Sequence, residues 1–260
     1  MSLRASIYRL LHSADSHSTI LKKVLLVYAA LFAVFATAAI LAPPSRSSAF
    51  LLSSAIVGAL VALCVSFVIS DGESHSRRMT VLLIGGMAVD LLCNYTALQF
   101  AEDNSSGEFI AALLKGLANV GVLSAATGAG LLLARGLREP HYLIMAAVVG
   151  AITDIFSVYA GPTKHLVKTS AFPYVSYQWG LIGSGGIFPC VGLGDFIFLA
   201  LYFAGVRKFG LDQKKTLLAM GAALVIGFLS TLISPRGVPA LPFMSFGLLA
   251  VNLRALRQKI

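Results

Sequence analysis

The sequence predicts an all-α membrane protein folded as a polytopic helix bundle. Of its 260 residues, 57% are hydrophobic and only 12% are charged, whereas a soluble domain carries about 25% charged residues. The mean hydropathy is +0.84. Apolar runs of about 20 residues, the helix length that crosses a bilayer core, recur along the chain. These observations exclude a soluble globular fold, a disordered chain and a nucleic-acid-binding module, although the net charge is +9.

Eight apolar runs have the composition of spanning helices, and one further segment before the fifth run would make nine. Residues 1–22 form a basic N-terminal segment, which we expect either as a short amphipathic helix on the membrane surface or as disordered chain. Residues 23–260 form a single transmembrane domain. Its predicted helices cover residues 24–42, 49–70, 79–101, 109–134, 141–160, 187–206, 216–234 and 238–253.

The positive charges predict which ends of these helices face the cytoplasm. Lys and Arg collect in cytoplasmic loops of membrane proteins. With the N-terminus inside and eight crossings, fifteen of the twenty Lys and Arg residues lie on the cytoplasmic side and four lie outside. We therefore expect a multi-pass membrane protein whose two termini are both cytoplasmic.

Three acidic residues lie inside the apolar runs. Of the eleven Asp and Glu residues, only Asp90, Asp154 and Asp195 are found there, and the other eight fall in loops or termini. An ionisable group in a membrane helix costs several kcal/mol unless it faces a partner or a water-filled cavity. These three residues are therefore the candidates for function.

Asp154 and Asp195 are predicted to lie at the same depth. They belong to consecutive, antiparallel helices, and each lies about 9–12 Å below the same membrane surface. Two carboxylates that meet in a low-dielectric site share one proton. One can then take a proton from water while the other protonates a carbonyl oxygen, as in aspartic proteases. The alternative is two separate polar groups, each hydrogen-bonded to backbone.

Two glycine- and proline-containing motifs accompany these aspartates. Gly192-Leu193-Gly194-Asp195 is a GxGD motif, whose glycines leave room for another backbone near the carboxylate. The second motif is Val238-Pro239-Ala240-Leu241-Pro242, which follows Pro235. Three prolines in eight residues forbid a regular helix. This stretch is therefore expected to be extended, which is tolerated at membrane depth only inside protein or beside a wet cavity.

In these motifs the chain resembles the GxGD intramembrane aspartyl proteases, which comprise presenilins, signal peptide peptidases and their prokaryotic relatives. The resemblance covers about residues 141–250. It consists of Asp154 in Thr153-Asp154-Ile155-Phe156, then Gly192-Leu193-Gly194-Asp195-Phe196-Ile197-Phe198, then Pro239-Ala240-Leu241-Pro242. It implies a prokaryotic presenilin homologue in a cell membrane.

The resemblance also implies roles for individual residues. Asp154 and Asp195 would be the catalytic pair, on helices 141–160 and 187–206. The residues that shape the site and hold substrate would be Gly192, Leu193, Gly194, Pro239, Ala240 and Leu241. The partners would be a transmembrane protein or peptide substrate and the lipid bilayer. No metal, organic cofactor or nucleic acid is implied.

The sequence departs from the family pattern in three ways. Thr153 stands where the first aspartate is usually preceded by Tyr, and Tyr159 is a poor substitute because it lies off the face of Asp154. Eight segments are found where nine are common. The charge distribution places the loop 161–185 outside, as in signal peptide peptidases, whereas presenilins keep it in the cytosol.

Two further features carry hypotheses of their own. Residues 174–179 are β-prone and precede several glycines, so this loop and the Pro239 stretch could offer strand edges to an unwound substrate. The alternative is an ordinary surface loop. Asp90 and Asn94 share one helix face, either as a group that tunes the aspartates or as a structural hydrogen-bonded pair.

Other protein classes also place carboxylates in membrane helices. A proton-coupled transporter or channel would do so, but it predicts broken helices in both halves of the chain. A prepilin peptidase is another GxGD protease, but it lacks the Pro-Ala-Leu motif. It also follows its aspartate with a Lys-Leu pattern where this chain has Phe196-Ile197-Phe198.

Overall fold

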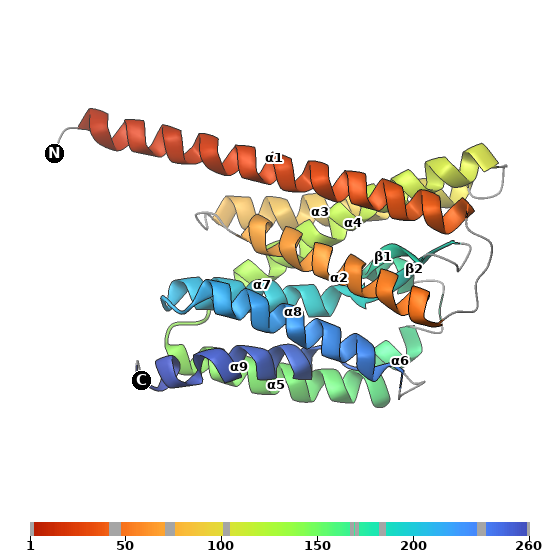
Figure 1. Cartoon of the computed structure of the whole chain (residues 1–260). Coiled ribbons are helices and arrows are strands. Elements are labelled where there is room, and N and C mark those ends of the chain that lie inside the picture. Colours follow the sequence, from red (N-terminus) through yellow and green to blue (C-terminus); the bar gives the residue numbers. More distant parts are fainter. Residues whose placement is uncertain are drawn as a thin grey trace.

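The protein is a mainly helical membrane bundle in which a β-hairpin is embedded (Figure 1). The computed structural model describes residues 3–41, 48–70, 76–100, 105–166, 169, 172–181, 186–232 and 238–258. Within these ranges, five helices are long and apolar enough to cross a membrane. They are α1 (Leu3–Leu41), α2 (Ser48–Ser70), α3 (Ser76–Phe100), α4 (Ser105–Ala134) and α5 (Pro140–Tyr159).

The second half of the chain has shorter elements. They are α6 (Pro162–Leu166), the 3-10 helix η1 (Phe172–Val175), β1 (Ser176–Leu181), β2 (Gly186–Gly192), α7 (Leu193–Lys208), α8 (Gln213–Ser230) and α9 (Leu241–Arg257). Helix α9 packs against α5 and α8, while α4 packs against α3 and α7. Helices α2, α7 and α8 therefore occupy the middle of the bundle, between α1, α3 and α4 on one side and α5 and α9 on the other (Figure 1).

The expectation of one helix over residues 187–206 is wrong in its first six residues. Residues Gly186–Gly192 form strand β2, and α7 begins only at Leu193. Pro189 interrupts the backbone hydrogen bonding of a helix, and the flanking glycines weaken it further, whereas Ile187 and Val191 favour a strand. Periodicity alone does not distinguish a short apolar strand from part of a spanning helix.

Most of the β-prone stretch at residues 174–179 forms a strand, since β1 begins at Ser176, whereas Tyr174 and Val175 belong to the 3-10 helix η1. Strand β1 pairs with β2 in antiparallel orientation, with an irregularity between Tyr177 and Gln178. Five consecutive residues of β1, from Ser176 to Gly180, are buried. The alternative of an ordinary surface loop is therefore wrong for this segment.

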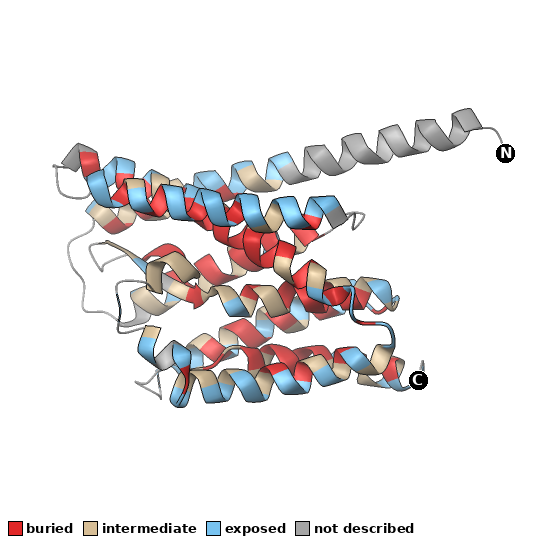
Figure 2. Cartoon of the chain, turned by 180° about the vertical axis from the view of Figure 1, so that it is seen from behind, coloured by how far each residue is buried: buried red, intermediate tan, exposed pale blue. Residues whose placement is uncertain are grey.

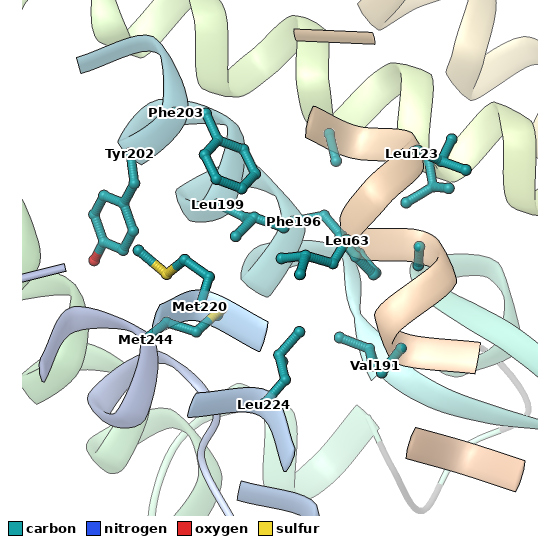
Figure 3. Packing of buried hydrophobic residues seen from close by; sticks show 14 of the residues in the cluster. Leu63, Leu123, Val191, Phe196, Leu199, Tyr202, Phe203, Met220, Leu224 and Met244 are labelled. Atoms are coloured by element: carbon teal, nitrogen blue, oxygen red, sulfur yellow. The ribbon is translucent and has the colours of Figure 1, made fainter. Parts of the chain in front are cut away.

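Strand β1 lies in the aromatic core of the bundle. Trp179 is fully buried and contacts the rings of Phe32 and Phe35 from α1. Gly58 of α2 makes this approach possible, because a Cβ there would lie 2.5 Å from the indole Cγ of Trp179. The core continues from the hairpin to a cluster in which α2, α7, α8 and α9 meet (Figure 3).

The outer faces of the bundle are apolar. Figure 2 shows buried residues in the interior and exposed residues on the outward faces of the helices. The exposed side chains include large hydrophobic ones on α3 and α5, among them Ile84, Leu92, Ile152 and Phe156, which are 63–67% exposed. A continuous apolar surface of this kind is stable against lipid but unfavourable in water. The fold thus supports the assignment to a membrane.

Polar side chains complete the helix ends away from the centre. Asp212 precedes α8, where its carboxylate accepts the Lys215 N–H at 3.0 Å and pairs with the Lys215 ammonium at 3.1 Å. This capping hydrogen bond is the main reason that the pKa of Asp212 lies below its usual value. Arg207, at the end of α7, donates to the carbonyl oxygens of Phe67 and Ser70 at the end of α2.

Candidate active site

Asp195 lies in the first turn of α7. Its Oδ2 accepts a hydrogen bond from the backbone N–H of Gly192, the residue that precedes the helix, at 3.2 Å. The first N–H groups of a helix have no partner within the helix, and the helix dipole favours negative charge there. The carboxylate is therefore held by the beginning of its own helix, directly after strand β2.

Asp154 lies on α5, one and a half turns before its end, and is half-buried. Its Oδ2 accepts the backbone N–H of Leu241, the first residue of α9, at 3.0 Å. This hydrogen bond joins two elements that are 87 residues apart in the chain. A second helix beginning thus supplies the donor for the second carboxylate.

The two carboxylates are close enough to repel each other electrostatically. Both also act on the hydroxyl group of Tyr202, which lies on α7 two turns beyond Asp195. Asp154 and Asp195 therefore lie within electrostatic reach of each other. Their shared surroundings are the beginnings of α7 and α9 and the face of α5.

The GxGD residues differ in their surroundings. Leu193 is half-buried against the core, and a Cβ on Gly192 would lie 3.5 Å from Oδ2 of Asp195, in ordinary contact. A Cβ on Gly194 would have no described atom within 4 Å. Gly194 therefore leaves open space one residue before Asp195, and no part of the described chain occupies that space.

The Pro-Ala-Leu motif forms the entry to α9. Val238 and Pro239 have no regular structure, Ala240 is the N-cap, and Leu241 begins the helix. Pro239 and Leu241 are buried, while Ala240 is half-buried. The predicted break in the helix is thus present, and α9 begins three residues later than the apolar segment 238–253. Pro235 lies outside the described residues.

A polar pair next to the aspartates was not predicted from the sequence. The hydroxyl groups of Tyr202 on α7 and Ser245 on α9 lie 2.8 Å apart, and both residues are buried. Ser245 follows Leu241 by one helical turn, so Asp154 and Tyr202 both contact the beginning of α9. The spacing of Tyr202 from Asp195 was a usable signal, but nothing in the sequence pairs it with Ser245.

The phenol expected near the first aspartate has no equivalent on α5. Thr153 is exposed, and Tyr159 is 46% exposed. Tyr202, from the opposite helix, is the tyrosine that lies within electrostatic reach of both carboxylates. A phenol is therefore present beside the pair, although its position in the sequence differs from the family pattern.

Asp90 belongs to a different cluster. It is buried on α3, and its Oδ1 accepts the side-chain N–H of Asn94 at 2.7 Å, as the helical spacing predicts. Asn94 in turn contacts the side chain of Gln178 in β1. Asp90 is thus connected to the hairpin rather than to α5 or α9.

Within the described part of the chain, no three His, Cys, Asp or Glu side chains gather to hold a metal ion. The chemistry available at this site is that of two carboxylates, a phenol and backbone N–H groups.

The sequence matches no known protein-family model and no curated protein, and the fold matches no solved structure. The resemblance to GxGD proteases therefore depends on the sequence motifs alone.

The Leu241 hydrogen bond predicts different stabilities for two substitutions of Asp154. Asp154→Leu leaves a buried backbone N–H without a partner, which costs about 1–3 kcal/mol, whereas Asp154→Asn keeps an acceptor oxygen. We expect a lower thermal unfolding midpoint in detergent for the leucine variant alone. Equal unfolding midpoints for the two variants would contradict the importance of this hydrogen bond.

Proposed function

We propose that this protein is an intramembrane aspartic endopeptidase that hydrolyses peptide bonds within or near transmembrane helices of other proteins. The observation that carries the proposal is the convergence of Asp154 and Asp195 beside the Pro-Ala-Leu motif. These are the residues that the GxGD resemblance selects as the catalytic pair, and their electrostatic interaction supports that assignment.

The proposed chemistry requires the two carboxylates to hold one proton. Their mutual repulsion in an apolar bundle favours this state. The ionised carboxylate removes a proton from water, whose oxygen bonds to the peptide carbonyl carbon, while the protonated one donates its proton to the carbonyl oxygen. In the second step the first carboxyl group protonates the leaving nitrogen. The other carboxylate takes a proton from the tetrahedral intermediate, and the C–N bond breaks.

The other site residues support this chemistry by holding the carboxylates and leaving room for the substrate. The N–H groups of Gly192 and Leu241 hold the carboxylates without placing a positive charge beside them. The space beside Gly194 admits the backbone of a substrate next to Asp195. The Pro239-Ala240-Leu241 stretch contributes the Leu241 N–H that holds Asp154.

A transmembrane substrate must unwind before it can be cut, and strand β2 offers it a partner. In β1, Gln178 directs both of its backbone groups to Asn119 of α4, away from β2. Because hydrogen-bonded and non-hydrogen-bonded pairs alternate, the backbone groups of Ile187, paired with Gly180, also face away from the other strand. An added substrate strand would therefore bind to the outer edge of β2, five residues before Gly192.

The proposed topology has eight crossings, with α7, α8 and α9 added to the five long apolar helices. The excess of positive charge on one side supports cytoplasmic termini in a prokaryotic cell membrane, with the loop 161–185 outside. This arrangement admits substrates of the polarity that signal peptide peptidases accept.

Neutralising either aspartate is expected to abolish cleavage of a single-span reporter by the purified protein. Asp154→Asn and Asp195→Asn keep the acceptor oxygens but remove the acid–base function, which is worth about 10²- to 10⁴-fold in rate. Asp212→Asn is the matched control, because it neutralises an exposed acid at the start of α8.

Cleavage products are measured by mass spectrometry in liposomes. Undiminished hydrolysis in either variant of the pair would contradict the proposal. Proton or solute flux without any proteolysis would instead identify the transporter alternative.

Substrate binding to β2 predicts an effect of Ile187→Pro on cleavage. Proline removes an N–H that faces away from β1, and no described residue outside the hairpin bonds to it. We expect kcat/KM to fall roughly three- to tenfold, the equivalent of one hydrogen bond, with an unchanged unfolding midpoint. Ile187→Val keeps the N–H and is the control. Full activity of the proline variant would exclude this edge as the binding site.

The proposed topology is tested by labelling a single cysteine in intact cells. In a background without Cys64, Cys93 and Cys190, His165→Cys introduces an exposed thiol into the 161–185 loop. We expect a membrane-impermeant maleimide to label it from outside. Gln213→Cys, at the start of α8, should react only after permeabilisation. The reverse pattern would establish the presenilin-like orientation.

A further inference from the structure

A chain of buried side chains links the first half of the protein to the hairpin. Asp90 Oδ1 accepts the Asn94 amide at 2.7 Å, and Asn94 Oδ1 accepts the Gln178 side-chain amide at 2.9 Å. Asn119 contacts the backbone of Gln178 from the neighbouring helix α4. All four residues are at most 5% exposed. This series of hydrogen-bonded side chains therefore runs from α3 through β1 to α4 inside the bundle.

Asn119 takes the place of a neighbouring strand for β1. Its Nδ2 donates to the Gln178 carbonyl at 2.6 Å, and its Oδ1 accepts the Gln178 N–H at 2.8 Å. A paired strand would make the same two hydrogen bonds. Ser54 of α2 also donates to the carbonyl of Gly180, two residues further along this edge. Side chains of two helices thus close the outer edge of β1 and fix its position.

The position of β1 determines the position of Asp195. Strand β2 is paired with β1 up to Gly192, which lies opposite Ser176. Gly192 is also the residue whose N–H holds the Asp195 carboxylate. A displacement of β1 at Gln178 is therefore transmitted through two strands to the catalytic carboxylate.

We propose that Asn119 and Gln178 are positioning residues of the aspartic site, and that Asp90 orients them. The acceptor oxygen of Asp90 turns the Asn94 amide so that its own oxygen faces Gln178. The amide of Asn119 then holds the backbone of Gln178 at a single register. This inference rests on the proposed proteolytic function for its kinetic consequence, but its structural part is independent of any activity.

Asn119→Asp tests the inference with the smallest possible change. The variant keeps the shape of the side chain and the oxygen that accepts the Gln178 N–H, but it replaces the donor to the carbonyl with an oxygen. Thr127→Val is the matched control on the same helix, because the buried Thr127 hydroxyl bonds only to Leu123 of its own helix among the described residues.

Hydrogen exchange of the peptide 174–192 is the activity-independent measurement, made on full-length protein in detergent. We expect exchange to rise about tenfold in Asn119→Asp, as the loss of one hydrogen bond predicts, and to stay unchanged in Thr127→Val. Cleavage of the reporter should fall in parallel through kcat. If hairpin exchange is unchanged, the inference is wrong even where the wild-type protein cleaves its reporter.

Two substitutions of Asp90 test whether its side-chain oxygen orients the Asn94 amide or whether any buried side chain at this position is sufficient. Asp90→Leu removes the carboxylate acceptor of the Asn94 amide and leaves it only the Asp90 backbone carbonyl, whereas Asp90→Asn retains a side-chain acceptor oxygen. We expect raised hairpin exchange in the leucine variant and recovery in the asparagine variant. Equal exchange in both variants would overturn the role of Asp90. If the wild-type protein has no proteolytic activity, the proposed function is wrong. The hydrogen-exchange results still show whether Asn119, Gln178 and Asp90 hold the hairpin in position.

Discussion

The structure depends on satisfying two carboxylates in an apolar bundle with no cationic partner among the residues that the structure describes. Each of Asp154 and Asp195 accepts a backbone N–H from a residue at the beginning of a helix. The first N–H groups of a helix have no partner within the helix, and the helix dipole favours negative charge there. Two helices must therefore start close together within the bundle. The glycines before α7 and the prolines before α9 are the local cause, because neither sequence continues a helix backwards.

A helix that starts inside the bundle leaves the preceding backbone with groups that need partners. Strand β2, which leads into Asp195, meets this need by pairing with β1. Strand β1 has the same need on its outer edge. There Asn119 bonds both backbone groups of Gln178, and Ser54 donates to the carbonyl of Gly180. Asn119 of α4 and Ser54 of α2 thus supply hydrogen bonds that are needed because α7 begins inside the bundle and is preceded by strands. This is why residues outside the GxGD and Pro-Ala-Leu motifs contribute to its geometry.

Local sequence was sufficient for the helices α2 to α5, because each is a long apolar run with few competing signals. It was also sufficient for the Asp90–Asn94 pair, which needs only helical spacing. It failed at residues 187–192, since a short apolar strand and part of a spanning helix are equally apolar. The contacts of Asp154 with Leu241, and of Tyr202 with Ser245, join residues 87 and 43 positions apart. No periodicity encodes such pairings, because they depend on how the helices pack.

The way in which the carboxylates are held bears on the choice between hydrolysis and transport. A transporter exchanges the partners of its carboxylates as it alternates between two states, and its broken helices occur in both halves of the chain. Here Asp195 is held by its own helix, so a rigid movement of α7 cannot separate it from Gly192. Asp154 is held by the first residue of α9, a helix that packs along α5 itself. Such local donors favour a single geometry, which the proposed general acid–base catalysis requires and alternating access does not.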